Sequence, residues 1–313
     1  YFRLGMVRQH LGERKKAHNM FEKALEIDPT HRDTLLAMVA LQEQQEEWES
    51  VVHAKRGLLA TASEKERVAL LGEIGEIYKE KLANPQKAIA SFTEALDFAP
   101  NDHSLLQRLL DLYVDTQQWK KAVETIVRFT EIEKEPVSRG QYFLASANIF
   151  RDKLQSIDEA VDHYNLALDN FFEDPAKLSA QMLPKALKAF AEIDKLQTTK
   201  RAWKDQERSY RNMLKRIDKP GVDPATYNKL RVDLLHALGE VYRSRLKHYQ
   251  SAVGAFELAQ QLDPDNAARA EILAELYLTA GSEYADKAVD QHVRMLNAEP
   301  FKYDSYKALY KIY

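Results

Sequence analysis

Histidine and carboxylate side chains are the residues most often used in metal centres and in acid–base catalysis. The nine histidines lie at positions 10, 18, 31, 53, 103, 163, 236, 248 and 292, and no two are three or four residues apart, as two ligands on one helix would be. Adjacent acids such as Glu46 and Glu47 are typical of a solvated helix surface. The chain has no cysteine, which excludes disulfides, thiolate metal sites and cysteine nucleophiles. The sequence therefore predicts no metal-binding residue.

Local motifs of the common enzyme classes are also missing from the sequence. It has no Gly-rich phosphate loop, no G-x-G-x-x-G dinucleotide fingerprint, no G-x-S-x-G nucleophile elbow and no H-E-x-x-H zinc helix. An enzyme without such a motif would have to assemble its site from distant segments. We therefore expect a protein that is not an enzyme, with no catalytic residue, no cofactor-binding residue and no cofactor.

Composition favours a soluble, folded, all-helical chain. Of the 313 residues, 45% are hydrophobic and 30% are charged, while only 10 are glycine and 10 are proline, as expected for helices joined by short turns. Forty-five basic residues against 48 acidic ones give a net charge of -3, which disfavours nucleic acid and anionic membranes as partners. Nothing in the sequence indicates insertion into a membrane. A cytoplasmic location is favoured, although the lack of cysteine is neutral on compartment.

A five-residue pattern recurs three times and shows how the helices are organised. The sequence YKEKL begins at Tyr78 and returns as FRDKL at Phe150 and, with Arg at both basic positions, as YRSRL at Tyr242. In each copy the leucine is followed, six residues later, by an alanine. A fixed distance between an aromatic residue and a small residue indicates a repeated helical unit.

Three longer segments carry one shared signature around these alanines. The segments combine a Gly with an Ala, a Phe, a second Ala and a Pro. They are Gly5, Ala17, Phe21, Ala24 and Pro29; Gly75, Ala88, Phe92, Ala95 and Pro100; and Gly239, Ala252, Phe256, Ala259 and Pro264. This signature resembles the tetratricopeptide repeat, a pair of antiparallel helices in which small residues allow close helix approach and aromatic residues fill the gaps.

The resemblance extends over nearly the whole chain and implies a single right-handed superhelical α-solenoid of antiparallel helix pairs over residues 1–313. The small residue of the second helix is expected at Ala17, Val51, Ala88, Ala122, Ala160, Gln206, Ala252 and Ala288. About eight repeats and the first helix of a ninth would span residues 1–31, 32–63, 64–101, 102–136, 137–175, 176–221, 222–265, 266–300 and, in part, 301–313. The registers of the second and sixth repeats are the least determined, and Pro and Asp predict long connections around residues 169–186 and 216–231.

Repeats of two types alternate. Trp48, Trp119 and Trp203 are expected at the start of the second helix in the even repeats, where a large aromatic side chain packs beside its own first helix. The YKEKL-type copies belong to the third, fifth and seventh repeats, which have one extra residue between the two helices. Their bases would lie in the last turn of the first helix, where free carbonyl groups favour a cation by about 0.3 to 1 kcal/mol.

In similar proteins the first helices line a concave groove that binds a protein or peptide. The resemblance therefore implies a scaffold or adaptor that binds a partner segment there. The residues at groove-facing positions that we single out are Glu76, Lys79, Gln107, Asp111, Asn148, Arg151, His236, Glu240 and Arg243. The residue pattern of the known dicarboxylate clamp is absent, since Asn148 stands at one clamp position but Leu144 occupies the position of its lysine.

Two interpretations of the groove bases Lys79, Arg151 and Arg243 stay open. They are either solvated charges that complement the helix dipole or spaced donors for a carboxylate-bearing or backbone-exposing peptide. His236 is expected to be a groove or packing residue rather than a ligand.

Other functions also remain as alternatives. Instead of a scaffold, the sequence is also compatible with an architectural or self-associating segment of a longer repeat protein. A helical repeat that binds RNA is a minor alternative. The chain starts without an initiating Met, so we expect the native N-terminus to be absent and the chain to be a piece of a longer array. Tyr306, Leu309 and Tyr310 near the other end predict a further helix or self-association through the exposed C-terminal helix.

Overall fold

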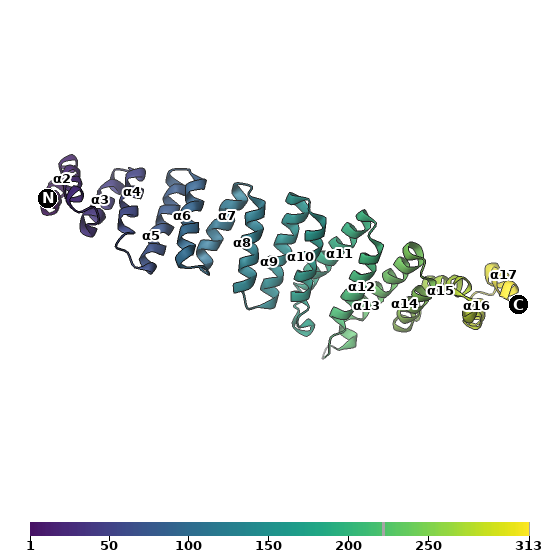
Figure 1. Ribbon diagram of the computed structural model, residues 1–313. Helices are drawn as coiled ribbons and strands as arrows, with labels where there is room; N and C mark the ends of the chain where they lie inside the picture. The colour runs from purple at the N-terminus through teal and green to yellow at the C-terminus, as the bar shows by residue number, and fades with distance from the viewer. Residues whose placement is uncertain (221–222, 313) are drawn as a thin grey trace. The chain divides into compact units, whose positions relative to one another are not determined.

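The computed structural model describes residues 1–220 and 223–312, and these residues form 17 α-helices and no strand. They divide into two compact units, Tyr1–Ile132 and Glu133–Tyr313. Within each unit, consecutive helices lie side by side and antiparallel (Figure 1). The all-α solenoid class expected from the sequence is therefore confirmed. No helix in the described residues is both long enough and apolar enough to cross a membrane.

The first unit contains four helix pairs. Their helices are α1 (Phe2–His10) and α2 (Arg14–Ile27), α3 (Arg32–Gln44) and α4 (Trp48–Leu58), α5 (Glu64–Glu76) and α6 (Pro85–Phe98), and α7 (His103–Asp115) and α8 (Trp119–Ile132).

The second unit contains four more pairs and one further helix. They are α9 (Pro136–Ile149) and α10 (Ile157–Phe171), α11 (Leu183–Lys200) and α12 (Trp203–Ile217), α13 (Asn228–Glu240) and α14 (Tyr249–Leu262), α15 (Ala267–Ala280) and α16 (Ala285–Ala298), and finally α17 (Tyr303–Ile312). The exact repeat boundaries, and their union into one solenoid over residues 1–313, stay predictions.

Local signals in the sequence set several helix starts. Ser63 and Glu66 form a reciprocal capping box at the start of α5. Asn84 caps α6, whose first residue is a proline, and Asp102 and Asn266 cap α7 and α15 through their side-chain oxygens. These caps satisfy backbone N–H groups that a helix start would otherwise leave unpaired.

Small residues bring the two helices of a pair into close contact, as the sequence predicts. A Cβ atom added to Gly75 would lie 2.4 Å from the ring of Phe92, and one added to Gly239 would lie 2.7 Å from the ring of Phe256. The eight residues expected to be the small residue of the second helix are all buried. Their exposed fractions are 0% for Ala17, Val51, Ala88, Ala122, Ala160, Ala252 and Ala288 and 6% for Gln206.

The three YKEKL-type segments form single π-helical turns at the end of a first helix. These turns are η1 (Ile77–Lys81), η2 (Phe150–Leu154) and η5 (Val241–Leu246). A π-turn takes in one extra residue without ending the helix. The added residue in the third, fifth and seventh repeats is therefore absorbed inside the first helix rather than in a longer loop.

The alternation of tryptophan and YKEKL-type repeats also has a structural reason. Lys81, the second base of its copy, lies over the ring of Trp48 at 5.1 Å, and Arg245 lies over the ring of Trp203 at 4.6 Å. Each base reaches back to the tryptophan at the start of the preceding pair's second helix. Such cation–π contacts stabilise by about 0.5 to 2 kcal/mol, so the second base of these two copies has a packing role.

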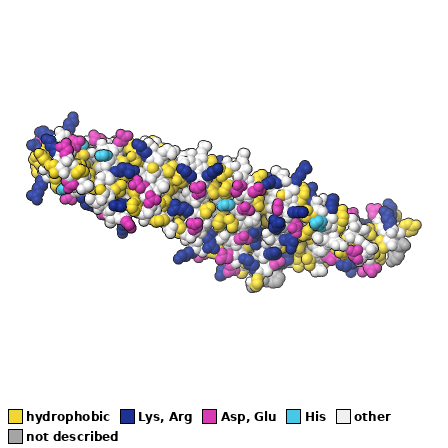
Figure 2. Space-filling view, in the orientation of Figure 1, with side chains coloured by type: hydrophobic (Ala, Val, Ile, Leu, Met, Phe, Trp, Pro, Cys, Tyr) yellow, Lys and Arg dark blue, Asp and Glu magenta, His cyan; other side chains and the backbone are white. Residues whose placement is uncertain are grey.

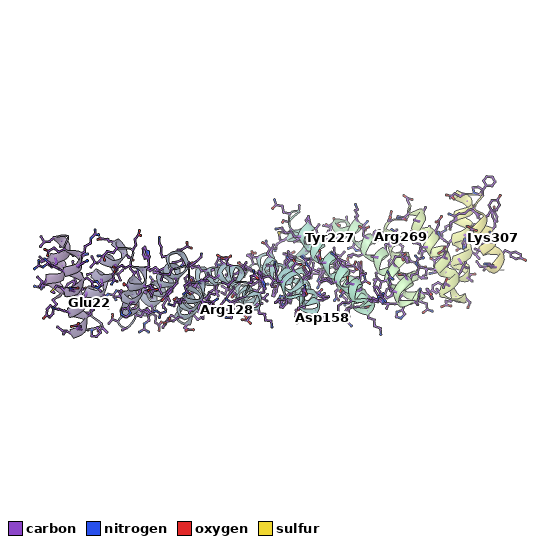
Figure 3. All side chains as sticks on the ribbon, turned by 90° about the horizontal axis from the view of Figure 1, so that it is seen from above. Glu22, Arg128, Asp158, Tyr227, Arg269 and Lys307 are labelled. Atoms are coloured by element: carbon purple, nitrogen blue, oxygen red, sulfur yellow. The ribbon has the colours of Figure 1, made fainter. Side chains whose placement is uncertain are left out.

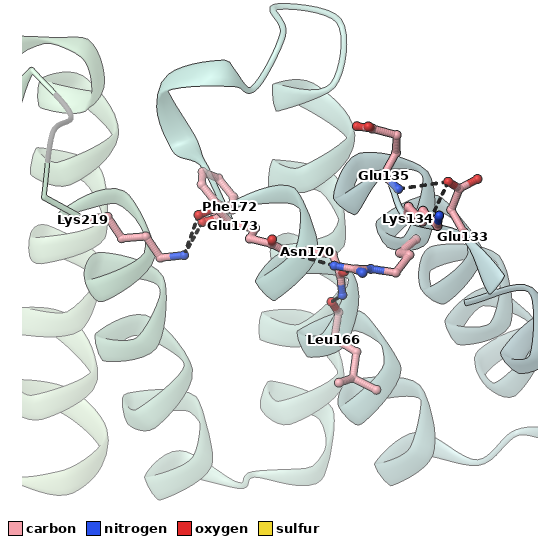
Figure 4. Close-up of polar contacts among 9 residues, drawn as sticks. Glu133, Lys134, Glu135, Leu166, Asn170, Phe172, Glu173 and Lys219 are labelled. Carbon is pink, nitrogen blue, oxygen red and sulfur yellow. Dashed lines mark hydrogen bonds and ion pairs between the residues drawn. The ribbon is translucent and has the colours of Figure 1, made fainter. Parts of the chain in front are cut away.

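The two long connections in the second unit hold each other in place. Lys219, just after α12, donates hydrogen bonds to the carbonyl oxygens of Phe172 and Glu173 at 2.5 and 3.2 Å (Figure 4). The hydroxyl of Tyr227 donates to the carbonyl oxygen of Pro175 at 2.8 Å; Tyr227 is labelled in Figure 3. The expected long connection around residues 216–231 includes positions 221 and 222, which lie outside the described residues, as does Tyr313 of the expected ninth repeat.

The Gly75 contact predicts a sharp difference between two glycine substitutions. Gly75→Ala should destabilise the chain by about 1–3 kcal/mol, because the added methyl group meets the Phe92 ring. Gly254→Ala, inside α14 with nothing within 4 Å of the added Cβ, should instead stabilise it by up to about 1 kcal/mol. Urea unfolding followed by circular dichroism measures both, and equal midpoints for the two variants would refute the close contact.

Candidate functional site

The predicted groove residues of the first unit are spread over α5, η1 and α7. Glu76 pairs with Arg108 at 3.1 Å, Lys79 pairs with the neighbouring Glu80 at 3.4 Å, and the Gln107 amide donates to Asp111 at 2.8 Å. Of the four predicted residues, only Glu76 is among the described residues that line a groove of about 640 Å³ between α3, α5 and α7.

Lys55 on α4 also lines this groove in the first unit. Its side chain is only 11% exposed, and its ammonium group pairs with Glu73 at 2.6 Å and with Glu43 at 3.4 Å. The positive charge of Lys55 is therefore already neutralised by two carboxylates that line the same groove.

In the second unit, Asn148 and Arg151 are brought together by a buried tyrosine. Tyr164 on α10 is fully buried, and its hydroxyl donates to Asn148 Oδ1 at 2.7 Å and accepts from Arg151 Nη1 at 2.8 Å. Burial raises the pKa of this hydroxyl to about 12, so it stays protonated and keeps donating. Because Asn148 accepts through its oxygen, its amide NH₂ group is left to donate elsewhere.

Arg151 itself is held by two carboxylates. Its Nε and Nη2 atoms donate to the two oxygens of Asp152 at 2.7 and 2.8 Å, and its Nη1 atom pairs with Glu192 on α11 at 2.9 Å. The hydrogen bonds to Asp152 raise the pKa of Arg151 and lower that of Asp152. The guanidinium therefore orders the site, while its charge is compensated locally.

A pocket of about 300 Å³ opens between the end of α9 and the first half of α11. Asn148, Arg151 and Tyr164 line one wall, and Lys185 and Lys188 line the other. Both lysines are exposed, and neither makes an ion pair or hydrogen bond with the part of the chain that the structure describes. Three cations against the carboxylates of Asp152 and Glu192 leave a net positive charge, so the pocket favours an anionic group.

His236, Glu240 and Arg243 form a separate cluster on α13 and η5. Arg243 donates to both oxygens of Glu240 at 3.0 and 3.1 Å and approaches Glu275 at 3.9 Å. The His236 ring packs edge-on against the Phe256 ring at 5.2 Å, and burial and then the charge of Arg269 lower its pKa. His236 thus makes the packing contact that was one of its two expected roles.

Of the nine predicted residues, only Asn148 and Arg151 share a pocket with unpaired cations. The sequence analysis missed Lys185, Lys188, Tyr164 and Glu192. The sequence shows that the two lysines are three residues apart on one helix. Because the register of the sixth repeat was not determined, the sequence did not show which face of the helix they occupy. No group of histidine and acidic side chains in the described ranges has the arrangement of a metal site.

Three histidines of the second unit predict a loss of stability in mild acid. Burial is the main cause that lowers the pKa of His163, His236 and His292 below the ordinary value of 6.5. The native state therefore favours the neutral form of these histidines. The free energy of unfolding is highest above pH 6.5, and it decreases as pH falls below this value because the unfolded state then binds more protons. The melting temperature should drop between pH 7.5 and pH 5.5, by about 2–4 °C for each kcal/mol lost.

A histidine variant makes this prediction specific. His292 is 6% exposed, and its Nδ1 atom lies 3.2 Å from the hydroxyl oxygen of the buried Ser305. His292→Gln should reduce the pH dependence of the melting temperature, whereas the same change at the exposed His53 should leave it unaltered. An identical pH profile for the parent and His292→Gln would contradict the assignment.

Comparisons with known proteins bear on the family. Models of the tetratricopeptide repeat match residues 1–31, 68–102 and 232–266, which cover the first helix pair and most of the third and seventh pairs. No match is found among curated proteins.

Solved structures similar to the chain share little of its sequence. They include YrrB, described as a TPR protein with an unusual peptide-binding site (17% identity, 59% of this chain and 90% of that one, TM-score 0.32). The Cut9–Hcn1 hetero-tetramer of the APC/C is 16% identical, with 96% of this chain covered but only 52% of that one, at a TM-score of 0.32. The C-terminal part of a TPR repeat-containing protein from Cytophaga hutchinsonii is 11% identical (87% and 98%, TM-score 0.33). At these values none of the three carries an argument about this chain. The chain therefore contains segments that match the tetratricopeptide repeat, and each of these segments lies over a pair of antiparallel helices.

Proposed function

We propose that the chain is a non-enzymatic scaffold that binds an acidic segment of a partner protein on the first helices of the second unit. The observation that carries this proposal is the pocket beside Arg151, where Lys185 and Lys188 have no ion-pair partner in the part of the chain that the structure describes. A carboxylate of a bound segment, from an acidic side chain or a C-terminus, would supply that partner. Hydrogen bonds between charged groups are about twice as strong as those between neutral ones.

The pocket is lined by two kinds of polar side chain, some held in place by hydrogen bonds and some exposed and able to change conformation. Asn148 and Arg151 are fixed by the buried Tyr164 hydroxyl, and the Asn148 amide is positioned to donate to a backbone carbonyl or a carboxylate. The two lysines are exposed and free to adjust to the ligand. The role of spaced donors first considered for Lys79, Arg151 and Arg243 passes to Lys185 and Lys188, because each of those three bases has a carboxylate of its own.

Charge removal at the two lysines tests this function. The probe is a fluorescent octapeptide of glutamate and glycine with a free C-terminus, compared with a glutamine and glycine counterpart whose C-terminus is amidated. Lys185→Gln combined with Lys188→Gln should weaken binding of the acidic peptide by about 5- to 20-fold, since two exposed ion pairs contribute up to about 1 kcal/mol each. Fluorescence anisotropy at low salt measures the dissociation constants.

A matched control separates the pocket from general electrostatics. Lys204 and Lys215 are exposed on α12 and make no ion pair in the described ranges. Replacing both with Gln changes the net charge equally and should leave affinity within about twofold. Equal weakening by both pairs of substitutions, or equal binding of the neutral peptide, would refute the pocket as the binding site.

A second candidate function, self-association, is favoured by the apolar surface around α17. Phe301 is 83% exposed, Tyr303 72%, Tyr306 52% and Tyr310 86%, and large exposed apolar patches commonly mark protein–protein contacts. This candidate predicts a concentration-dependent dimer in sedimentation equilibrium. Phe301→Ser with Tyr310→Ser should shift it to monomer, whereas Leu278→Ser, at a 45% exposed position on α15, should not. A parent chain that is monomeric at all concentrations would remove this candidate.

A further inference from the structure

A second pocket lies between α10 and α12 and is separate from the site described above. Its volume is about 420 Å³, and its walls come from α10, the last turn of α11 and the first half of α12. The lining is mostly polar and includes Asp162 on α10, Gln197 on α11 and Ser209 on α12. Asp158 at the start of α10 is labelled in Figure 3 and also lines the pocket.

Gln197 is nearly buried and has a polar atom with no partner. The residue is 5% exposed, and its Nε2 atom donates to the hydroxyl oxygen of Ser209, itself 6% exposed, at 2.9 Å. The Oε1 atom is buried and accepts no hydrogen bond in the described part of the chain. Turning the amide over would let Oε1 accept from Ser209 but would leave Nε2 without a partner. In either orientation the fold satisfies only one end of this amide, which is unfavourable for a buried group.

The charges around this pocket do not cancel. Lys200 pairs with Asp158 at 2.5 Å, and Arg208 pairs with Asp205 at 3.2 Å. Asp162 is exposed and makes no ion pair with the described residues. Among the described residues, the pocket lining therefore includes one carboxylate without an ion pair, Asp162, and one amide oxygen without a donor, Gln197 Oε1, and both attract a cation that can donate hydrogen bonds.

We propose that this pocket receives an arginine side chain from a partner protein. The guanidinium would donate to Gln197 Oε1 on α11 and to the Asp162 carboxylate on α10. Arginine fits better than lysine, because its planar fork of five N–H donors can reach acceptors on two walls at once and it loses hydration more readily. Arginine is also among the residues most enriched at the centres of protein interfaces. This contact is independent of the pocket beside Arg151 that we propose binds an acidic segment, which is lined by α9, α10 and the first half of α11.

Recognition of the guanidinium is tested with a matched pair of peptides. The probes are acetyl-Gly-Arg-Gly-amide and the same peptide with citrulline, a neutral residue of nearly equal shape. Titration of the full chain, followed by the chemical shifts of backbone amides in α10 and α12, should show saturable millimolar binding of the arginine peptide and at least tenfold weaker binding of the citrulline peptide. Equal affinities, or shifts that are not centred on these helices, would overturn the proposal.

Two variants separate recognition from folding. Gln197→Leu combined with Ser209→Ala removes both partners of the buried hydrogen bond, so the melting temperature should be unchanged or higher while arginine binding is lost. If this variant is poorly folded, Asp162→Asn at an exposed position supplies the same test and should weaken binding about tenfold. Asp290→Asn, an equal change at an exposed position on α16, should have no effect. Unaltered arginine binding in Asp162→Asn would overturn the proposal.

Discussion

The close crossing of the two helices within a pair is the contact on which the rest of the structure depends. At Gly5, Gly75 and Gly239 an added Cβ atom would lie within 2.7 Å of a phenylalanine ring of the paired helix. That distance fixes how far apart the two helices are and where the connection between them must begin. An extra residue in the first helix then cannot push its partner away, and it is taken up as a π-turn at the helix end. These π-turns place Lys81 and Arg245 over the tryptophan rings of the preceding helix pairs.

Several basic side chains that face the helix grooves are compensated by carboxylates of the same chain. Arg151, Arg243 and Lys55 each lie within ion-pair distance of at least two carboxylates. On the face shown in Figure 2, basic and acidic side chains are intermixed. Among the described residues, Lys185 and Lys188 make no ion pair and the buried Oε1 atom of Gln197 accepts no hydrogen bond, but the same is true of other exposed lysines, such as Lys204 and Lys215, and of the Oε1 atoms of Gln42 and Gln206. What distinguishes the lysines on α11 and Gln197 from these is that they line pockets, where a bound partner would supply the missing contact.

The sequence could predict the helix pairs because their determinants are local. Gly75, Ala88 and Phe92 lie within one repeat, so their spacing already encodes the contact. The site depends on residues brought together from separate helices, such as Arg151 with Glu192 or Gln197 with Ser209, whose meeting depends on helix rotation that a one-residue register error would change. The π-turns could not be predicted from the sequence either. The sequence shows the extra residue, but a longer loop between the two helices would account for it equally well.

Both candidate pockets involve α11, the helix that departs most from the repeat pattern. It has 18 residues, and its partner helix carries Gln206 where the other pairs have a small apolar residue. The Nε2 atom of Gln206 donates to Asp194 at 2.7 Å and to Thr198 at 2.9 Å, while its buried Oε1 atom accepts no hydrogen bond in the described residues. The lengthened helix presents Lys185 and Lys188 toward α9 and carries Gln197 one turn before its other end. Functional sites are the expected places for a sequence to break its own structural rules and to compensate for the break nearby. The sixth repeat was hard to align because Gln206 and the longer α11 depart from the shared pattern, and both pockets proposed above as binding sites are lined by the same helix.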